Sequence, residues 1–206
     1  MRILSRNDQN GRSMVEMLGV LAIIGVLSVG GISGYSKAMA KFKLTKAQDQ
    51  ITMMLMNIRT AYATSPSYTG LSSTIAAQYN IAPAEMVVEE TGGTFYLNGA
   101  FGGRVDIGTL GAGHTYFYIT MRALGKEACR SLATSDWGAD GLISMDIGKE
   151  SGNATTAQTP VFAEAACTKS DGHFCTADLP LVLTDLGTST GTLCGDESNY
   201  ISWVYY

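Results

Sequence analysis

The feature that most limits what this chain can fold into is an uncharged, mainly apolar stretch near its start. It runs for twenty residues from Met17 to Ser36 and reads MLGVLAIIGVLSVGGISGYS. At about 1.5 Å per residue, a helix of this length crosses much of a bilayer. Arg2, Arg6 and Arg12 precede it, and such charges favour the cytoplasmic side. We therefore expect a membrane segment whose N-terminal end lies in the cytoplasm.

Four residues of this region do not fit a plain anchor: Glu16, Gly25, Gly30 and Gly34. Glu16 stands at its head, where an unpaired carboxylate in lipid costs about 2.5 kcal/mol or more, so a partner charge is expected. Gly30 and Gly34 weaken the helix by roughly 1 kcal/mol each, yet their spacing puts them on one face and lets two helices approach closely. Packing against other helices would compensate for both costs.

A second helical pattern continues directly from the apolar stretch. Its apolar residues recur three and four positions apart, which is typical of an amphipathic helix. No helix breaker interrupts the pattern before Ser65 and Pro66. We expect one helix from about Met14 to Thr64, with its first half bare and protruding and its second half packed on a domain. The apolar residues of the second half are Leu44, Ala47, Ile51, Leu55, Ile58 and Tyr62.

The residues after Pro66 predict a head built on an antiparallel β-sheet, so the expected fold class is α+β. Short β-like runs alternate with turns. A helix is predicted over residues 121–132, from apolar residues at helical spacing, and the glycines between residues 92 and 113 predict a surface connection. The predicted strands cover residues 94–97, 114–121, 141–147, 179–183 and 200–206.

Composition and histidine placement argue against several classes of function. A formal net charge of −4 and a charged fraction of 16% provide no basic stripe to follow a phosphate backbone, so we expect no nucleic acid partner. The two histidines, His114 and His173, lie in no catalytic signature. We therefore expect no enzyme, no cofactor and no metal site.

The cysteines point to disulfides. All four lie in the second half of the chain without a CxxC pair, and an even number after an export signal favours bridges over the alternative of reduced thiols in the cytosol. His173 lies between Cys167 and Cys175, where a metal site is the alternative to a small disulfide loop, and the loop is favoured in an exported domain. With Cys129 and Cys194 included, three pairings are possible.

The run GRSMVE, from Gly11 to Glu16, followed by the apolar stretch, resembles the class III signal of type IV prepilins. That signal is a short polar leader ending in Gly, a Glu five residues after the cut, and an apolar helix. In the family a prepilin peptidase cleaves after the Gly and methylates the new amino group, and the Glu pairs with the amine of a neighbouring subunit. The resemblance implies a cut between Gly11 and Arg12 and an assembly role for Glu16. The family usually has a hydrophobic residue after the cut, where this chain has Arg12.

The segment ACRSLATSDWG, residues 128–138, resembles the corresponding segment of type IVb pilins of the PilS-like group. In such heads a C-terminal strand commonly lies within the sheet, and residues 200–206 have the β propensity for it. One bridge commonly closes a long C-terminal region there. This implies that Cys129 pairs with Cys194, tying the final strand to the head, and that Cys167 pairs locally with Cys175. Crossed pairs, or free inner cysteines, remain the alternatives.

The resemblance as a whole implies a structural subunit without catalysis. Its segments would be a leader at 1–11, a helix at 12–64 that is first membrane anchor and filament core and then amphipathic, and a head at 65–206 with a disulfide-bounded C-terminal region. The implied partners are other copies of the chain, the prepilin peptidase, the inner-membrane pilus assembly machinery and, before assembly, the membrane. The product would be an extracellular major-pilin filament for adhesion, aggregation or conjugative contact.

Other interpretations share parts of this pattern. A minor pilin or a type II secretion pseudopilin would have the same kind of N-terminus. An ordinary secretory signal would use Ala38, Met39 and Ala40 as a small-x-small cleavage site, and a secreted or signal-anchored enzyme would follow. The secretory interpretations leave the helical pattern after residue 40 without an explanation.

Overall fold

A computed structural model describes residues 9–90, 92–138, 141–150, 158–160, 167–188 and 191–206. The chain divides into two compact units, Met1–Phe42 and Lys43–Tyr206. The long helix α1 spans Gln9–Ala61 and contributes residues to both. The expected α+β class, a long N-terminal helix followed by an antiparallel sheet, is confirmed.

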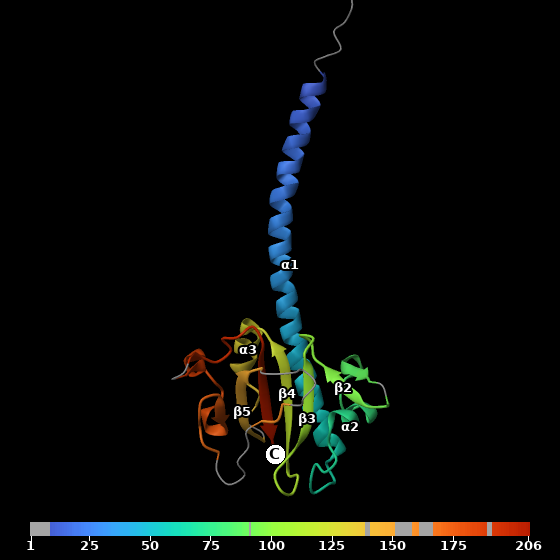
Figure 1. The fold of residues 1–206 in the computed structure, drawn as a ribbon, viewed down its shortest axis with the longest axis vertical. Helices are drawn as coiled ribbons and strands as arrows, with labels where there is room; N and C mark the ends of the chain where they lie inside the picture. Colours follow the sequence, from blue (N-terminus) through green and yellow to red (C-terminus); the bar gives the residue numbers. More distant parts are fainter. Residues whose placement is uncertain (1–8, 91, 139–140, 151–157, 161–166, 189–190) are drawn as a thin grey trace, which may run out of the picture. The chain divides into compact units, whose positions relative to one another are not determined.

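In the described part of the chain, seven strands form one antiparallel sheet in the order β1-β2-β3-β4-β9-β5-β6 (Figure 1). A separate two-stranded hairpin joins β7 to β8. The strands are β1 Val87–Glu89, β2 Phe95–Asn98, β3 Arg104–Leu110, β4 Tyr116–Leu124, β5 Leu142–Lys149, β6 His173–Cys175, β7 Gly187–Thr188, β8 Gly191–Thr192 and β9 Asn199–Tyr205. The shorter helices are α2 Ser73–Gln78, α3 Lys126–Ala133 and the 3₁₀ turns η1 Ala84–Met86, η2 Thr176–Asp178 and η3 Leu183–Leu186.

The last strand, β9, lies in the middle of the sheet between β4 and β5, where Figure 1 draws it in red. Its Trp203 is paired with Ile119 on β4 and with Met145 on β5. All three side chains have no exposed surface. Because β9 pairs with a strand on each side, it holds the two halves of the sheet together. The strand predicted at 200–206 is therefore central to the structure of the head.

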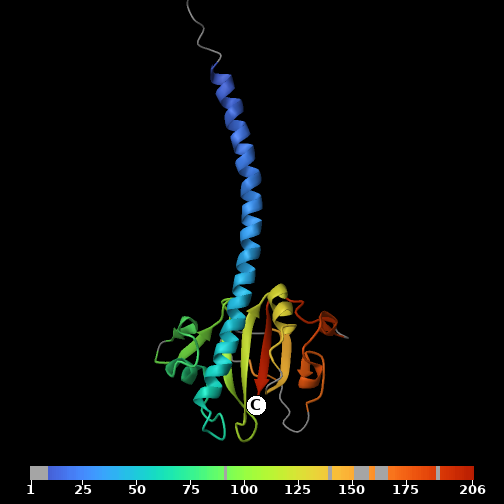
Figure 2. The ribbon, with the colours of Figure 1, turned by 180° about the vertical axis from the view of Figure 1, so that it is seen from behind.

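The part of α1 that belongs to the second unit lies across one face of the sheet (Figure 2). Ala47, Ile51, Met54 and Ile58 are fully buried there, spaced four, three and four residues apart along one helix face. The sequence pattern placed Leu55 on this face, but the structure leaves Leu55 only half-buried. Adjacent Met54 fits the spacing better and takes the central position.

Three expectations for the head are wrong in detail. Residues 179–183 contain no strand, because Pro180 lacks the N–H that a sheet ladder needs. The glycine-rich connection contains the buried strand β3, whose Gly108 leaves room for the Tyr118 ring; a Cβ there would lie 2.7 Å from its hydroxyl. The helix predicted over 121–132 is the shorter α3, since Met121 and Leu124 belong to β4.

Candidate functional site

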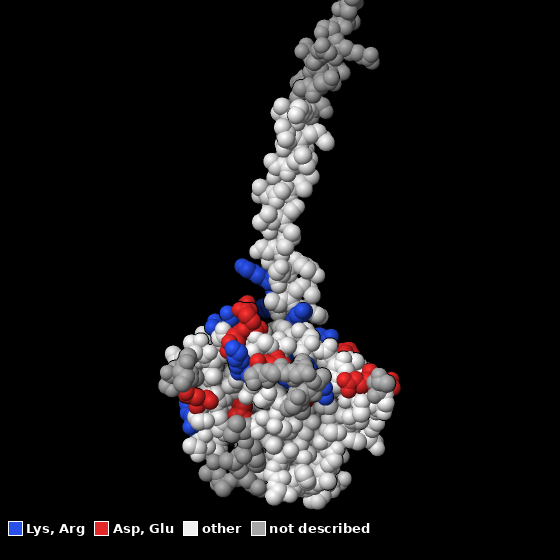
Figure 3. All heavy atoms as spheres, in the orientation of Figure 1, with Lys and Arg blue, Asp and Glu red and all other residues white. Residues whose placement is uncertain are grey.

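The most unusual surface of the molecule is the first unit's share of α1. Among the described residues this is the one helix long and apolar enough to cross a membrane. Ile24 is the least exposed of its large apolar side chains at 52%, and Val26 the most at 75%. Figure 3 shows this stretch white along most of its length in the view drawn. The exposed set is Met14, Val15, Met17, Leu18, Val20, Leu21, Ile23, Ile24, Val26, Leu27, Val29, Ile32, Tyr35 and Phe42.

The sequence-derived assembly residues all lie on this helix. Glu16 is exposed, two residues after the first apolar side chain of the set, Met14. At Gly30 and Gly34 an added Cβ would meet no atom of the described chain within 4 Å. Contacts within this chain therefore do not require glycine at either position, and a close approach there has meaning only for a helix from another molecule. Gly11 and Arg12 are helical in backbone, and their side chains lie outside the described residues.

The sheet face opposite α1 carries a row of buried polar side chains. Neighbouring strands place them side by side in register, and their exposures range from 0% to 7%. Near the middle of the row the Thr120 and Ser202 hydroxyls are hydrogen-bonded at 2.6 Å. Sequence reasoning missed this row, because its members come from five strands and only the register aligns them. The row is Asp106, Thr120, Ser202, Asp146 and His173.

Next to the row, Arg122 forms the centre of a buried ion cluster. Its guanidinium lies 2.9 Å from a carboxylate oxygen of Glu150 and 3.6 Å from one of Asp106, and its side chain is 1% exposed. Glu150 also accepts hydrogen bonds from the Ala123 N–H and the Ser198 hydroxyl. Each carboxylate thus has partners within the protein, and the cluster is a structural one.

The tyrosines of this sheet show how thoroughly water is excluded from it. Burial, assisted by the charge of Asp106, raises the pKa of Tyr118 to about 12. Burial also raises the pKa of Tyr205, against the opposing influence of Arg59, which lies 5.7 Å from the centre of its ring. Neither tyrosine is therefore placed to act as an acid or base near neutral pH.

All four cysteines are bridged in the structure. Cys129 on α3 is joined to Cys194, five residues before β9, across a sequence separation of 65. Cys167 is joined to Cys175 at the end of β6, across a separation of 8. The first bridge connects the approach to the central strand with the helix beside the sheet. The second closes a local loop that contains His173.

The long bridge is expected to contribute most to stability. Replacing both Cys129 and Cys194 with serine should lower the free energy of unfolding by about 4 kcal/mol, because the open chain gains loop-closure entropy. The same change at Cys167 and Cys175 should cost about 2 to 3 kcal/mol in this model. Urea unfolding of both variants in mild detergent measures the difference. A larger loss from opening the short loop would contradict this ranking.

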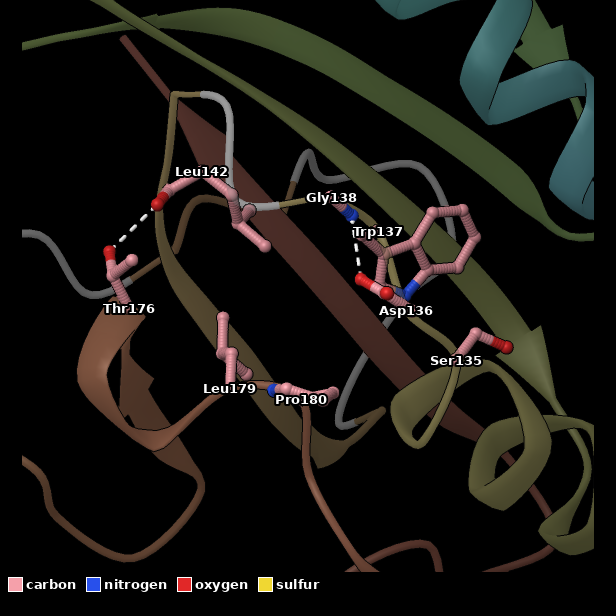
Figure 4. A pocket seen from close by; sticks show the side chains of 8 residues that line it. All are labelled: Ser135, Asp136, Trp137, Gly138, Leu142, Thr176, Leu179 and Pro180. Carbon is pink, nitrogen blue, oxygen red and sulfur yellow. Dashed lines mark hydrogen bonds between the residues drawn. The ribbon is translucent and has the colours of Figure 1, made fainter.

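A small pocket lies between the end of α3, β5 and η2 (Figure 4). Two of its polar atoms are already engaged: the Asp136 carboxylate accepts a hydrogen bond from the Gly138 N–H, and the Thr176 hydroxyl donates to the Leu142 carbonyl. What remains is mainly apolar surface without a nucleophile and base pair. The lining residues are Ser135, Asp136, Trp137, Gly138, Leu142, Thr176, Leu179 and Pro180.

Comparison with known proteins identifies the family. The PilS N-terminal family model matches residues 42–177. Two major structural subunits of bundle-forming pilus align over 183 residues, 82% of this chain and 93% of each relative: one from Escherichia coli O127:H6 at 26% identity and one from Escherichia coli O111:H- at 28%. The crystal structure of a type IVb pilin from Salmonella typhi aligns with a TM-score of 0.45 at 15% identity, over 79% of this chain and 97% of that one. Because the family model covers more than half of the sequence, this chain belongs to the PilS N-terminal family.

Proposed function

We propose that this chain is the structural subunit of a type IV pilus, made as an inner-membrane precursor and polymerised through residues 14–42 into an extracellular filament. The observation that carries the proposal is the apolar surface of α1 over residues 14–42, where fourteen large side chains are each more than half exposed. Burying each of them stabilises by about 1.5 kcal/mol or more, so leaving all in water costs on the order of 20 kcal/mol. Such a surface has to be covered by lipid or by other helices.

The transfer from lipid to filament needs interactions other than hydrophobic burial, since lipid tails are as apolar as leucine. Gly30 and Gly34 supply one, because the open space beside them lets a neighbouring helix approach closely. Glu16 supplies another, because its carboxylate gains a counter-charge when the terminal amine of a neighbouring subunit docks beside it. That amine arises when a prepilin peptidase cuts between Gly11 and Arg12.

Catalysis has no part in this proposal. The relatives are named as structural subunits, and the function follows from polymerisation, with adhesion, aggregation or conjugative contact at the filament surface. The inner-membrane assembly machinery takes the processed subunit from the membrane. The description of both relatives as major structural subunits supports a main subunit over a minor pilin or pseudopilin.

Replacing Glu16 with alanine is the direct test. We expect filament yield in sheared surface fractions to fall at least about 10-fold, as loss of one charge pair of 1.4 kcal/mol or more implies. Precursor insertion and cleavage should continue, so N-terminal sequencing of the membrane-bound subunit should still begin at Arg12. Asp49→Ala is the matched control, because Asp49 is an exposed carboxylate on the part of α1 that belongs to the second compact unit. Normal filament yield from the Glu16 variant would refute the charge pairing.

A further inference from the structure

The Asp146 carboxylate, the His173 imidazole and the sulfur of Cys167 lie in a row in space beside β5 and β6. The His173 Nδ1 is hydrogen-bonded to Asp146 Oδ1, and the His173 Nε2 lies 3.3 Å from the Cys167 Sγ. His173 is 7% and Asp146 3% exposed. The sulfurs of Cys167 and Cys175 and a ring nitrogen of His173 all lie within 4.8 Å of one another.

Asp146 determines the tautomer of His173, so that the ring nitrogen facing the sulfur carries a lone pair. An ionised carboxylate only accepts hydrogen bonds, so the His173 Nδ1 carries the proton and donates it to Asp146. The Nε2 of the neutral ring is then an acceptor, directed at the Cys167 Sγ. The bridge in this structure has no proton to donate. The contact becomes a hydrogen bond only when Cys167 is a thiol, so the arrangement suits the protein before the bridge closes.

We propose that His173, positioned by Asp146, is the general base that deprotonates Cys167 and accelerates closure of the Cys167–Cys175 bridge by a small-molecule or protein disulfide. This assigns a thiol-activating site to a chain whose function in the filament is structural. A base held against a thiol is the usual way in which proteins activate a sulfur nucleophile.

The reaction balances with one external disulfide, RSSR. The Cys167 thiol passes its proton to the His173 Nε2, and the thiolate attacks one sulfur of RSSR to form a mixed disulfide. The departing thiolate takes the proton from His173 and leaves as RSH. His173 then accepts the proton of Cys175, whose thiolate attacks the Cys167 sulfur and expels the second thiolate. This thiolate takes the proton from His173 and leaves as RSH. The two cysteines lose two electrons, and RSSR is reduced to two RSH.

The size of the effect follows from thiol ionisation. An unassisted thiol with a pKa near 8.5 is about 3% ionised at pH 7, so complete ionisation gains at most about 30-fold in rate. A more acidic thiol is also a weaker nucleophile, which reduces the expected gain to roughly 10-fold. Above pH 9 an ordinary thiol ionises without help. The advantage provided by His173 should therefore disappear there, which distinguishes a base from a residue that merely holds the loop.

Few other ionisable groups near this site can imitate the effect. Tyr200 on β9 has a raised pKa through burial and the charge of Asp146, so it stays neutral over the tested range. Lys169, before β6, has its ammonium 3.4 Å from Asp178 on η2. Asp146 on β5 is the carboxylate that is hydrogen-bonded to the His173 Nδ1. Asp171 lies in the turn before His173.

The experiment follows closure of both bridges in the same molecule. The full chain in detergent is reduced with dithiothreitol, freed of it, and mixed with oxidised glutathione at pH 7, 8 and 9. Samples are quenched with acid and N-ethylmaleimide, and peptide mapping measures each bridge separately. We expect His173→Asn to close Cys167–Cys175 roughly 10-fold more slowly at pH 7 and at nearly the wild-type rate at pH 9. The Cys129–Cys194 bridge reports on folding, and its closure rate should be unchanged.

Two further variants sharpen the result. Asp146→Asn should slow the short bridge at pH 7 as well, because an amide can donate to Nδ1 and leave an N–H directed at the sulfur. His114→Asn is the control, because His114 is exposed and has a positive φ of 53° that asparagine tolerates. The proposal is overturned if His173→Asn has no effect at pH 7, slows both bridges alike, or slows the short bridge equally at pH 7 and pH 9.

Discussion

Trp203→Ala is expected to lower the free energy of unfolding by about 3 to 5 kcal/mol, a large part of the 5 to 15 kcal/mol typical of a folded domain. The side chain has no exposed surface and packs against Trp137 with ring centres 4.8 Å apart. Its strand pairs with β4 on one side and β5 on the other, so the cavity would open at the centre of the sheet. Neighbouring strands cannot collapse into it without losing register.

Urea unfolding followed by far-ultraviolet circular dichroism measures this loss, and two variants provide the comparison. Trp203→Phe should cost clearly less, because the smaller ring still fills part of the site and the buried indole N–H has no acceptor among the described residues. Tyr206→Ala, three residues further along the chain, should cost little, because Tyr206 is 67% exposed. A loss below about 1 kcal/mol for Trp203→Ala would contradict the central role of β9.

The sequence alone was sufficient where local patterns decide the structure. The apolar and amphipathic patterns predicted one long helix, and α1 spans Gln9–Ala61. Apolar and β-branched residues predicted β9, which pairs with β4 on one side and with β5 on the other. Both patterns repeat over many residues, so single exceptions such as Glu16 or Gly30 do not obscure them.

The sequence was insufficient where distant residues decide the structure. β3 was not predicted because glycines in this region indicated a loop, and only the fold shows that Gly108 makes room for Tyr118. The buried ion cluster of Arg122 had no local signal in the sequence, since its partners Asp106 and Glu150 lie elsewhere in the chain. The contact between His173 and Asp146 depends on the pairing of β5 with β6, which no local pattern specifies.

Removal of residues 1–42 is expected to yield a soluble monomer, because it removes the surface that we propose to enter the membrane and to polymerise. The deletion removes one of the two compact units and with it the fourteen exposed apolar side chains between Met14 and Phe42. The remaining part of α1 keeps Ala47, Ile51, Met54 and Ile58, which are buried against the sheet. Size-exclusion chromatography with light scattering, in buffer without detergent, measures the mass of the product.

Deletion of residues 1–11 alone is the control, since it removes the proposed leader and keeps the apolar surface from Met14 to Phe42. That protein should still need detergent, because each of its exposed apolar side chains remains. Exposed apolar residues of the second unit, such as Met53 at 49% and Met56 at 62%, are few enough for a soluble domain. Aggregation of the chain that starts at Lys43, with intact strand content, would show that the polymerising surface extends beyond residue 42 onto the head.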